Sequence, residues 1–140
     1  MYLVDTNVLS ELRRSRRSPD VVAWLAGVPA DGLYLSVITV GEIAKGIAKV
    51  RRGRSTKAAV DADALQSWLE GLLSEHSQRI LPVTVPIATR WGRLCDVHPE
   101  LAADMLIAAT ALEHDLTVAT RNVDHFRPAR VRVVNPFESS

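Results

Sequence analysis

Residues 1–14 read MYLVDTNVLSELRR and contain the pattern that decides the fold. The short apolar run Tyr2–Val4 predicts a buried strand, and Val8–Arg14 has the apolar spacing of a helix. Asp5 directly follows the predicted strand. The chain therefore opens with a strand-to-helix unit in which the strand ends on a carboxylate.

The same alternation of short apolar runs and helical patterns continues along the chain. Further strands are predicted at Leu33–Ile38, Ile80–Val83, Leu116–Ala119 and Val131–Val134. Further helices are predicted at Pro19–Ala26, Val40–Val50, Ala58–Glu75, Ile87–Asp96 and Glu100–His114. Strands that alternate with helices, with few hairpin signals, are typical of a parallel sheet covered on both faces. We therefore expect an α/β fold.

The composition favours one globular domain that spans residues 1–140. Hydrophobic residues make up 47% and charged residues 24%, which excludes a disordered chain. No apolar run approaches the roughly 20 residues that span a bilayer, and the N-terminus lacks the features of a signal peptide. The single cysteine, Cys95, cannot form an internal disulfide, so we expect a cytoplasmic protein without a membrane partner.

Basic residues are concentrated in the first part of the chain, although the formal net charge is only +1. Residues 1–60 hold ten Lys and Arg against five Asp and Glu (+5), and residues 61–140 hold seven against eleven (−4). The basic residues form two clusters: Arg13, Arg14, Arg16 and Arg17, then Lys45, Lys49, Arg51, Arg52, Arg54 and Lys57. In the second cluster, three cations recur at helical spacing with Glu42. Such clusters are either solvated faces or a surface for a polyanion such as nucleic acid.

Several enzyme classes are disfavoured because their motifs are missing. No strand is followed by the Gly-x-Gly-x-x-Gly of dinucleotide-binding folds, and the histidines show no His-Glu-x-x-His pairing. Gly41 and Gly46 have the spacing of a phosphate-binding loop, but Ile47 stands where the lysine belongs. We interpret these glycines as helix-packing positions. Cys95 has no base near it in sequence, and we interpret it as a small core residue.

A set of acidic and amide residues lies where a parallel α/β sheet binds ligands, beyond the carboxyl ends of its strands. Its members are Asp5, Glu42, Asp104, Asn122 and Asp124. Each has a structural alternative. Asp5 is also a good helix cap, Glu42 completes a capping box with Thr39, and Asp104 suits a helix start. Asn122 and Asp124 also suit a turn, but their spacing along an extended chain predicts that they face the same way.

Asp104 is the most informative member, because Ala108 and Ala111 on the same helix face are small and apolar. A carboxylate on such a face is costly to desolvate unless it is paired or binds a metal. Carboxylates gathered at one sheet edge repel one another, so the set predicts a divalent cation, and oxygen ligands favour Mg²⁺ or Mn²⁺ over zinc. The reaction class that follows is metal-assisted phosphodiester hydrolysis with water as the nucleophile.

Four motifs follow one another along the chain: YLVDTN at 2–7, LSVITVGE at 35–42, ADMLIAATA at 103–111 and LTVATRN at 116–122. In this combination the sequence resembles the PIN domain, most closely the VapC-type toxin ribonucleases of bacterial toxin–antitoxin pairs. The resemblance implies a three-layer α/β/α sandwich with a central parallel sheet of four to five strands. It also implies RNA cleavage with Mg²⁺ or Mn²⁺, a homodimer, and inhibition by a small VapB-type antitoxin that assembles with the toxin on operator DNA.

Carried over by position, the acidic quartet of the family falls on Asp5, Glu42, Asp104 and Asn122, with the first three as metal ligands. Asn122 departs from the pattern, because many relatives have a carboxylate there. Its amide offers an oxygen or orients a water but brings no charge, so a second metal is expected only if Asp124 replaces that charge. The predicted function is a metal-dependent endoribonuclease toxin. The alternative is a weakly active or inactive PIN module that acts mainly as the partner subunit of a DNA-binding repressor complex.

Overall fold

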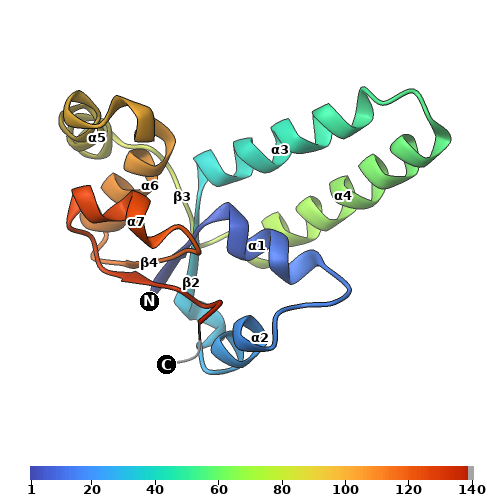
Figure 1. The fold of residues 1–140 in the computed structure, drawn as a ribbon, viewed down its shortest axis with the longest axis horizontal. Coiled ribbons are helices and arrows are strands. Elements are labelled where there is room, and N and C mark those ends of the chain that lie inside the picture. Colours follow the sequence, from blue (N-terminus) through green and yellow to red (C-terminus); the bar gives the residue numbers. More distant parts are fainter. Residues whose placement is uncertain (139–140) are drawn as a thin grey trace.

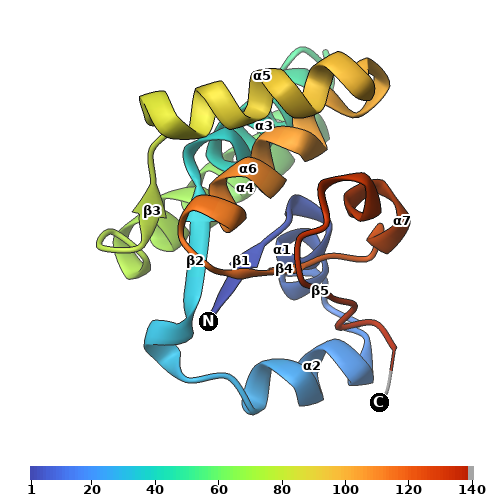
Figure 2. The same ribbon diagram turned by 90° about the vertical axis from the view of Figure 1, so that its left-hand side faces the viewer.

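The computed structural model describes residues 1–138, which form a five-stranded sheet with helices on both faces (Figures 1 and 2). The strands are β1 (Tyr2–Val4), β2 (Leu33–Ser36), β3 (Ile80–Leu81), β4 (Thr117–Ala119) and β5 (Val133–Val134). The α-helices are α1 (Thr6–Arg13), α2 (Pro19–Ala26), α3 (Val37–Arg51), α4 (Thr56–Glu75), α5 (Val85–Val97), α6 (Ala102–Glu113) and α7 (Val123–Phe126). Short 3₁₀ turns cover Ala30–Gly32, Pro99–Leu101 and Arg127–Ala129. The predicted domain, residues 1–140, extends two residues beyond the described chain.

All strand pairs are parallel, and the sheet order is β3-β2-β1-β4-β5. In the register, Leu3 lies between Tyr34 of β2 and Val118 of β4. The carboxyl ends of the three central strands therefore meet at one edge of the sheet, which is the edge where such folds bind ligands. The α/β/α sandwich with a parallel sheet is confirmed.

Two hydrophobic cores lie on opposite faces of the sheet because successive strand residues point to opposite sides. Leu3 belongs to the core that contains Met105, Val118 and Phe126, under α5, α6 and α7. Val4 belongs to the other core, whose fully or largely buried members are Val8, Leu9, Val21, Leu35, Ile43, Ile47, Ala62 and Leu69. Within the described residues, every helix is too short or too polar to cross a membrane.

The boundary between β2 and α3 lies earlier than the sequence pattern predicts. The strand ends at Ser36 and not at Ile38, and the helix begins at Val37 and not at Val40. The reason is the Ser36 hydroxyl, which accepts a hydrogen bond from the Ile38 N–H at 3.1 Å and caps the helix. The apolar residues that looked like strand therefore form the first turn of α3.

Helices α3 and α4 form a long hairpin that projects from the body of the molecule (Figure 1). Ile43 and Ile47 are the buried apolar residues of α3 on this hairpin. A Cβ added at Gly41 or at Gly46 would meet nothing within 4 Å. The interpretation of these two glycines as helix-packing positions is therefore wrong. Cys95 is half-buried against the α6 core, in agreement with its assignment as a small core residue.

Candidate active site

Asp5 is the most enclosed carboxylate of the predicted set. It directly follows β1, and its N–H donates to the Ala119 carbonyl oxygen at 2.9 Å, which extends the pairing of β1 with β4. The residue is only 6% exposed. Its Oδ1 accepts a hydrogen bond from the Thr6 N–H at 2.9 Å, so Asp5 is also the N-cap of α1. The cap alternative therefore accounts for one of the two carboxylate oxygens.

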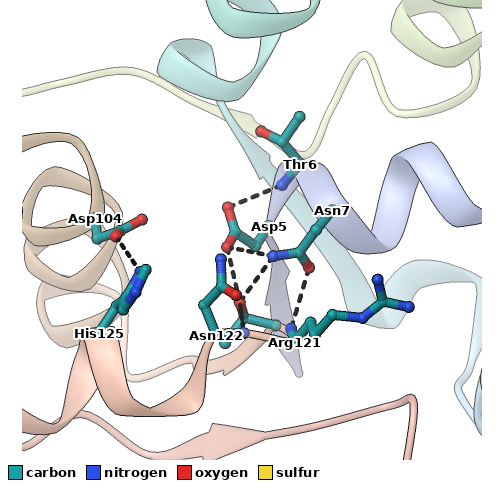
Figure 3. Close-up of polar contacts among 8 residues, drawn as sticks. Asp5, Thr6, Asn7, Asp104, Arg121, Asn122 and His125 are labelled. Atoms are coloured by element: carbon teal, nitrogen blue, oxygen red, sulfur yellow. Dashed lines mark hydrogen bonds and ion pairs between the residues drawn. The ribbon is translucent and has the colours of Figure 1, made fainter.

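The other oxygen of Asp5 faces the loop after β4 (Figure 3). Asp5 Oδ2 accepts hydrogen bonds from the Thr120 hydroxyl at 2.8 Å and from Asn7 Nδ2 at 3.3 Å. Asn7 Nδ2 also lies 3.3 Å from Thr120 Oγ1, and Asn7 Oδ1 accepts from the Arg121 N–H at 3.1 Å. The Thr120 hydroxyl in turn accepts from the Asn122 N–H at 3.0 Å. These bonds fix the orientation of Asp5 by joining the start of α1 to the end of β4.

Glu42 reaches the same region from α3. Its Oε1 accepts a hydrogen bond from the Thr6 hydroxyl at 3.4 Å, so Thr6 contacts both Asp5 and Glu42. The capping-box alternative for Glu42 is wrong, because Ser36 and not Thr39 caps the helix. The Thr39 hydroxyl is fully buried, and it has no hydrogen-bond partner in the described part of the chain.

Asp104 lies across from Asp5, in the first turn of α6 (Figure 3). Ala108 and Ala111, which share its helix face, are fully buried as predicted. The Asp104 side chain itself keeps 25% of its surface exposed, so it is less desolvated than the sequence suggested. Its Oδ2 lies 3.0 Å from Nδ1 of His125 on α7.

Asn122 and Asp124 both line the cleft along the loop after β4, but their side chains make different contacts. The Asn122 side chain lies beside Asp5 (Figure 3), whereas the Asp124 side chain is 82% exposed and pairs with Arg127 Nε at 3.1 Å. The extended spacing assumed for these two residues is wrong because β4 ends at Ala119 and residues 123–126 turn into α7. Asn122 thus belongs to the cluster around Asp5, and the Asp124 carboxylate contacts Arg127 on the surface.

The three carboxylates interact electrostatically. The pKa of Asp5 is raised, first by burial and further by repulsion from Asp104, against the opposing hydrogen bonds from Thr120 and Thr6. The pKa of Glu42 is also raised, by partial desolvation and then by repulsion from Asp5 and Asp104. Both shifts show that the site disfavours the full negative charge of its carboxylates.

The donor set fits a hard divalent cation in its chemistry. Its members are carboxylate oxygens whose charges repel one another, and such oxygens are the ligands preferred by Mg²⁺ and Mn²⁺. In residues 1–138 no three His, Cys, Asp or Glu side chains stand close enough together to hold a metal ion. The carboxylates come from three separate elements, namely the end of β1, α3 and α6.

Two clefts are adjacent to the carboxylates. One of about 270 Å³ runs along α1, α3 and α4 and is lined by Thr6, Arg13 and Glu42 among others. The second, of about 430 Å³, lies along the loop after β4 and is lined by Arg121, Asn122 and His125 among others. A third cleft of about 410 Å³ lies between α1, α2 and α4, with none of the predicted site residues in its lining.

Sequence reasoning missed the residues that support the carboxylates. Asn7 and Thr120 lie in the motifs at 2–7 and 116–122 but were not predicted as site residues, although both bind Asp5. Their positions are a usable signal, because Asn7 is in the first turn after β1 and Thr120 directly follows β4, and adjacent parallel strands bring such residues together. The contact of His125 with Asp104 spans 21 positions and leaves no comparable pattern in the sequence.

Comparisons with known proteins agree with this geometry. Residues 2–131 match the PIN domain family. The chain is 39% identical to Toxin FitB of Neisseria gonorrhoeae, over 98% of this chain and 99% of that protein. It is 33% identical to VapC ribonuclease Y4jK of Sinorhizobium fredii, over 99% of each chain.

Solved structures give the same result. FitAcB from Neisseria gonorrhoeae superposes with a TM-score of 0.84 at 38% identity, covering 99% of this chain and 100% of that chain. FitAB bound to an IR36 DNA fragment gives a TM-score of 0.82 at 36% identity, with 100% and 98% covered. A toxin–antitoxin complex from Klebsiella pneumoniae gives a TM-score of 0.64 at 27% identity, with 99% and 100% covered.

Proposed function

Because the chain belongs to the PIN-domain family, we propose that it is a metal-dependent endoribonuclease toxin that hydrolyses RNA phosphodiester bonds and is neutralised by a cognate antitoxin. Its likeness to a VapC ribonuclease and to Toxin FitB supports both parts of this function. The observation that carries the proposal is Asp5, a carboxylate kept buried opposite Asp104 although its charge is disfavoured there. A bound cation offsets that cost.

The proposed metal ligands are Asp5, Glu42 and Asp104, with Mg²⁺ or Mn²⁺ as the cofactor, and binding would bring these three side chains closer together than they stand in residues 1–138. When bound, the cation supplies positive charge that stabilises the transition state of phosphodiester hydrolysis. Asp5 is held in place by the Thr6 N–H and the Thr120 hydroxyl, so its orientation is set before the substrate arrives. We assign Asn122 the role of orienting the attacking water through its amide, which brings no charge to the site.

The RNA backbone is proposed to lie along the exposed basic side of α3. Lys45 and Lys49 are exposed on α3, the helix that carries Glu42, and the exposed Arg52 is its C-cap. Lys45 is near enough to Glu42 to oppose the rise in its pKa. A row of cations that begins beside a catalytic carboxylate suits a polyanion whose scissile phosphate lies at the carboxylates.

The proposed partners are a small VapB-type antitoxin and a second copy of the chain. The likeness to a toxin–antitoxin complex from Klebsiella pneumoniae supports the antitoxin. The likeness to FitAB bound to a DNA fragment supports assembly of toxin and antitoxin on operator DNA. An RNA substrate is consistent with action in the cytoplasm. The homodimer rests on the family resemblance alone.

A second candidate function is a weakly active or inactive PIN module that serves mainly in the DNA-binding complex. Asn122 favours this alternative, because it replaces the carboxylate of many relatives with a neutral amide. The buried and braced Asp5 favours an enzyme, because a module that only binds a partner has no need for a carboxylate whose charge is disfavoured.

Cleavage of a panel of transfer, ribosomal and messenger RNA tests the choice between these functions. The wild-type chain is expected to cleave at least one RNA in Mg²⁺ or Mn²⁺ and none in EDTA, and Asp104→Asn is expected to be inactive. A wild-type chain that cleaves nothing, but still binds operator DNA together with its antitoxin, would establish the alternative.

A further inference from the structure

His125 contacts a carboxylate of the candidate active site from a different element. It lies on α7, and its Nδ1 is 3.0 Å from Oδ2 of Asp104 on α6 (Figure 3). The His125 side chain is 49% exposed and the Asp104 side chain is 25% exposed. The contact therefore sits at the rim of the site, where one ring edge meets the carboxylate and part of the ring faces solvent.

The direction of this hydrogen bond follows from the groups involved. An ionised carboxylate only accepts hydrogen bonds, so the proton of the contact is carried by Nδ1 of His125. Both the neutral ring with its proton on Nδ1 and the protonated ring can donate in this way. The contact therefore does not depend on the charge state of the histidine.

The orientation of the Asp104 carboxylate depends on such a contact more than that of Asp5 does. Asp5 is buried and accepts hydrogen bonds from Thr6, Asn7 and Thr120, which leave its carboxylate little freedom. Asp104 is partly exposed on a helix surface, where an aspartate side chain can rotate between staggered conformers. A single donor on a neighbouring element is sufficient to select one of these conformers.

We propose that His125 is a positioning residue that holds the Asp104 carboxylate toward the site through its Nδ1–H, an inference that rests on the proposed role of Asp104 as a metal ligand. A hydrogen-bond donor behind a ligating carboxylate fixes the orientation of that carboxylate and lowers the cost of ordering it when a cation binds. His125 itself neither binds the metal nor moves a proton in this role.

The molecule contains a second histidine–carboxylate contact with which that of His125 can be compared. His98 Nδ1 lies 3.4 Å from Glu100 Oε1, and the Glu100 side chain is 64% exposed. This contact is longer, its carboxylate is more exposed than Asp104, and that carboxylate is not part of the predicted site. Substitution of His98 is therefore a matched control for the loss of a histidine–carboxylate contact outside the site.

Titration calorimetry of the metal-free full chain with Mn²⁺ tests the proposal. His125→Phe keeps a ring of similar size but has no donor, and it is expected to weaken Mn²⁺ binding about 10-fold. His125→Asn places an amide N–H near the position of Nδ1 and is expected to restore binding to within about 3-fold of wild type. His98→Phe is expected to bind Mn²⁺ like wild type. Thermal melts in EDTA are expected to show all three variants folded.

RNA cleavage kinetics distinguish a positioning role of His125 from a general structural role. His125→Phe is expected to lower kcat at a fixed Mn²⁺ concentration with little change in KM, and His125→Asn is expected to recover kcat. Unchanged Mn²⁺ affinity in His125→Phe overturns the proposal, as does a His125→Asn variant no better than His125→Phe. If Asp104→Asn binds Mn²⁺ as tightly as wild type, the metal role of Asp104 fails, and the positioning role of His125 fails with it.

Discussion

Asp5 and Asp104 face each other across the candidate active site, and the fold holds them in different ways. Asp5 is 6% exposed and is bound by donors that belong to α1 and to the end of β4. Asp104 stands on the surface of α6 with a quarter of its side chain exposed and contacts His125. The first carboxylate is therefore part of the packing of the sheet edge, and the second is attached to a finished helix. Changes at Asp5 should affect both stability and chemistry, whereas changes at Asp104 should affect chemistry without destabilising the fold.

The largest expected effect is the one that both carboxylates share. Asp5→Asn and Asp104→Asn should each reduce RNA cleavage by roughly 10³-fold or more, because loss of a charged ligand removes several kcal/mol of transition-state stabilisation. Cleavage assays in Mg²⁺ measure this loss. Thermal melts in EDTA then distinguish the two variants. Asp104→Asn should melt at the wild-type temperature or higher, because repulsion between residue 104 and Asp5 is relieved. An Asp104→Asn chain that unfolds would falsify the surface role of Asp104.

The contacts around Asp5 should be worth a measurable part of the free energy of unfolding. Thr120→Val keeps the shape of the side chain but removes the hydroxyl that binds Asp5 and Asn122, which should cost about 1–3 kcal/mol in urea unfolding. Thr39→Val is the matched control, because its buried hydroxyl has no partner among residues 1–138. That change should be neutral or stabilise the chain by up to about 1 kcal/mol. Equal costs for the two variants would show that the Thr120 hydroxyl does not brace Asp5.

The pH dependence of stability should also distinguish Asp5. Because its pKa is raised in the folded chain, the folded state binds that proton more tightly than the unfolded state does. The resulting stability is fully present below the ordinary value of 3.8 and is lost as the pH rises through the raised folded pKa. Melts in EDTA should therefore show wild type losing stability relative to Asp5→Asn as the pH rises from 3.8 through the raised pKa of Asp5. A constant difference between the two proteins across this range would contradict the raised pKa.

A smaller effect is expected at Asn122, which lies beside Asp5 but lacks a charge. Asn122→Asp adds a carboxylate to the cluster and should strengthen Mn²⁺ binding or add a second site, as measured by calorimetry. Asp124→Asn should change neither Mn²⁺ binding nor cleavage, because Asp124 pairs with Arg127 on the surface. If Asp124→Asn costs as much activity as Asp104→Asn, Asp124 supplies the missing fourth charge and the surface pair is rearranged in the active enzyme.

The smallest effects concern the basic side of α3, which lies outside the carboxylate pair. Lys45→Gln, Lys49→Gln and Arg52→Gln should each flatten the dependence of RNA binding on salt by about 0.7 in the log–log slope. Arg132→Gln is the control, because Arg132 pairs with Asp115 just before the amino end of β4, at the opposite edge of the sheet. Binding measured at several salt concentrations gives the slopes. Unchanged slopes would mean that these three side chains are only solvated surface residues and do not contact the RNA.

The features of the fold and site that depend on strand order could be predicted from the sequence. The side-chain contacts between separate elements could not. The alternation of strands and helices placed Asp5 and Asn122 at the carboxyl edge, because parallel strands leave no other arrangement. The Thr39–Glu42 capping box was an alternative in the sequence because Thr-x-x-Glu is a common cap pattern, and only the Ser36 hydroxyl shows where the helix begins. The contact of His125 with Asp104 depends on how α7 packs on α6, which no local pattern encodes.

Three consecutive residues, the last two of β1 and Asp5 directly after it, have a consequence for how the protein tolerates mutation. Leu3 fills one core, Val4 fills the other, and Asp5 follows them into the site. Because side chains alternate along a strand, a one-residue insertion or deletion there would exchange the two cores and turn Asp5 away from Thr120. Selection for stability and selection for catalysis therefore act on three consecutive codons. An engineered variant of this enzyme has little freedom to improve one property at that strand without losing the other.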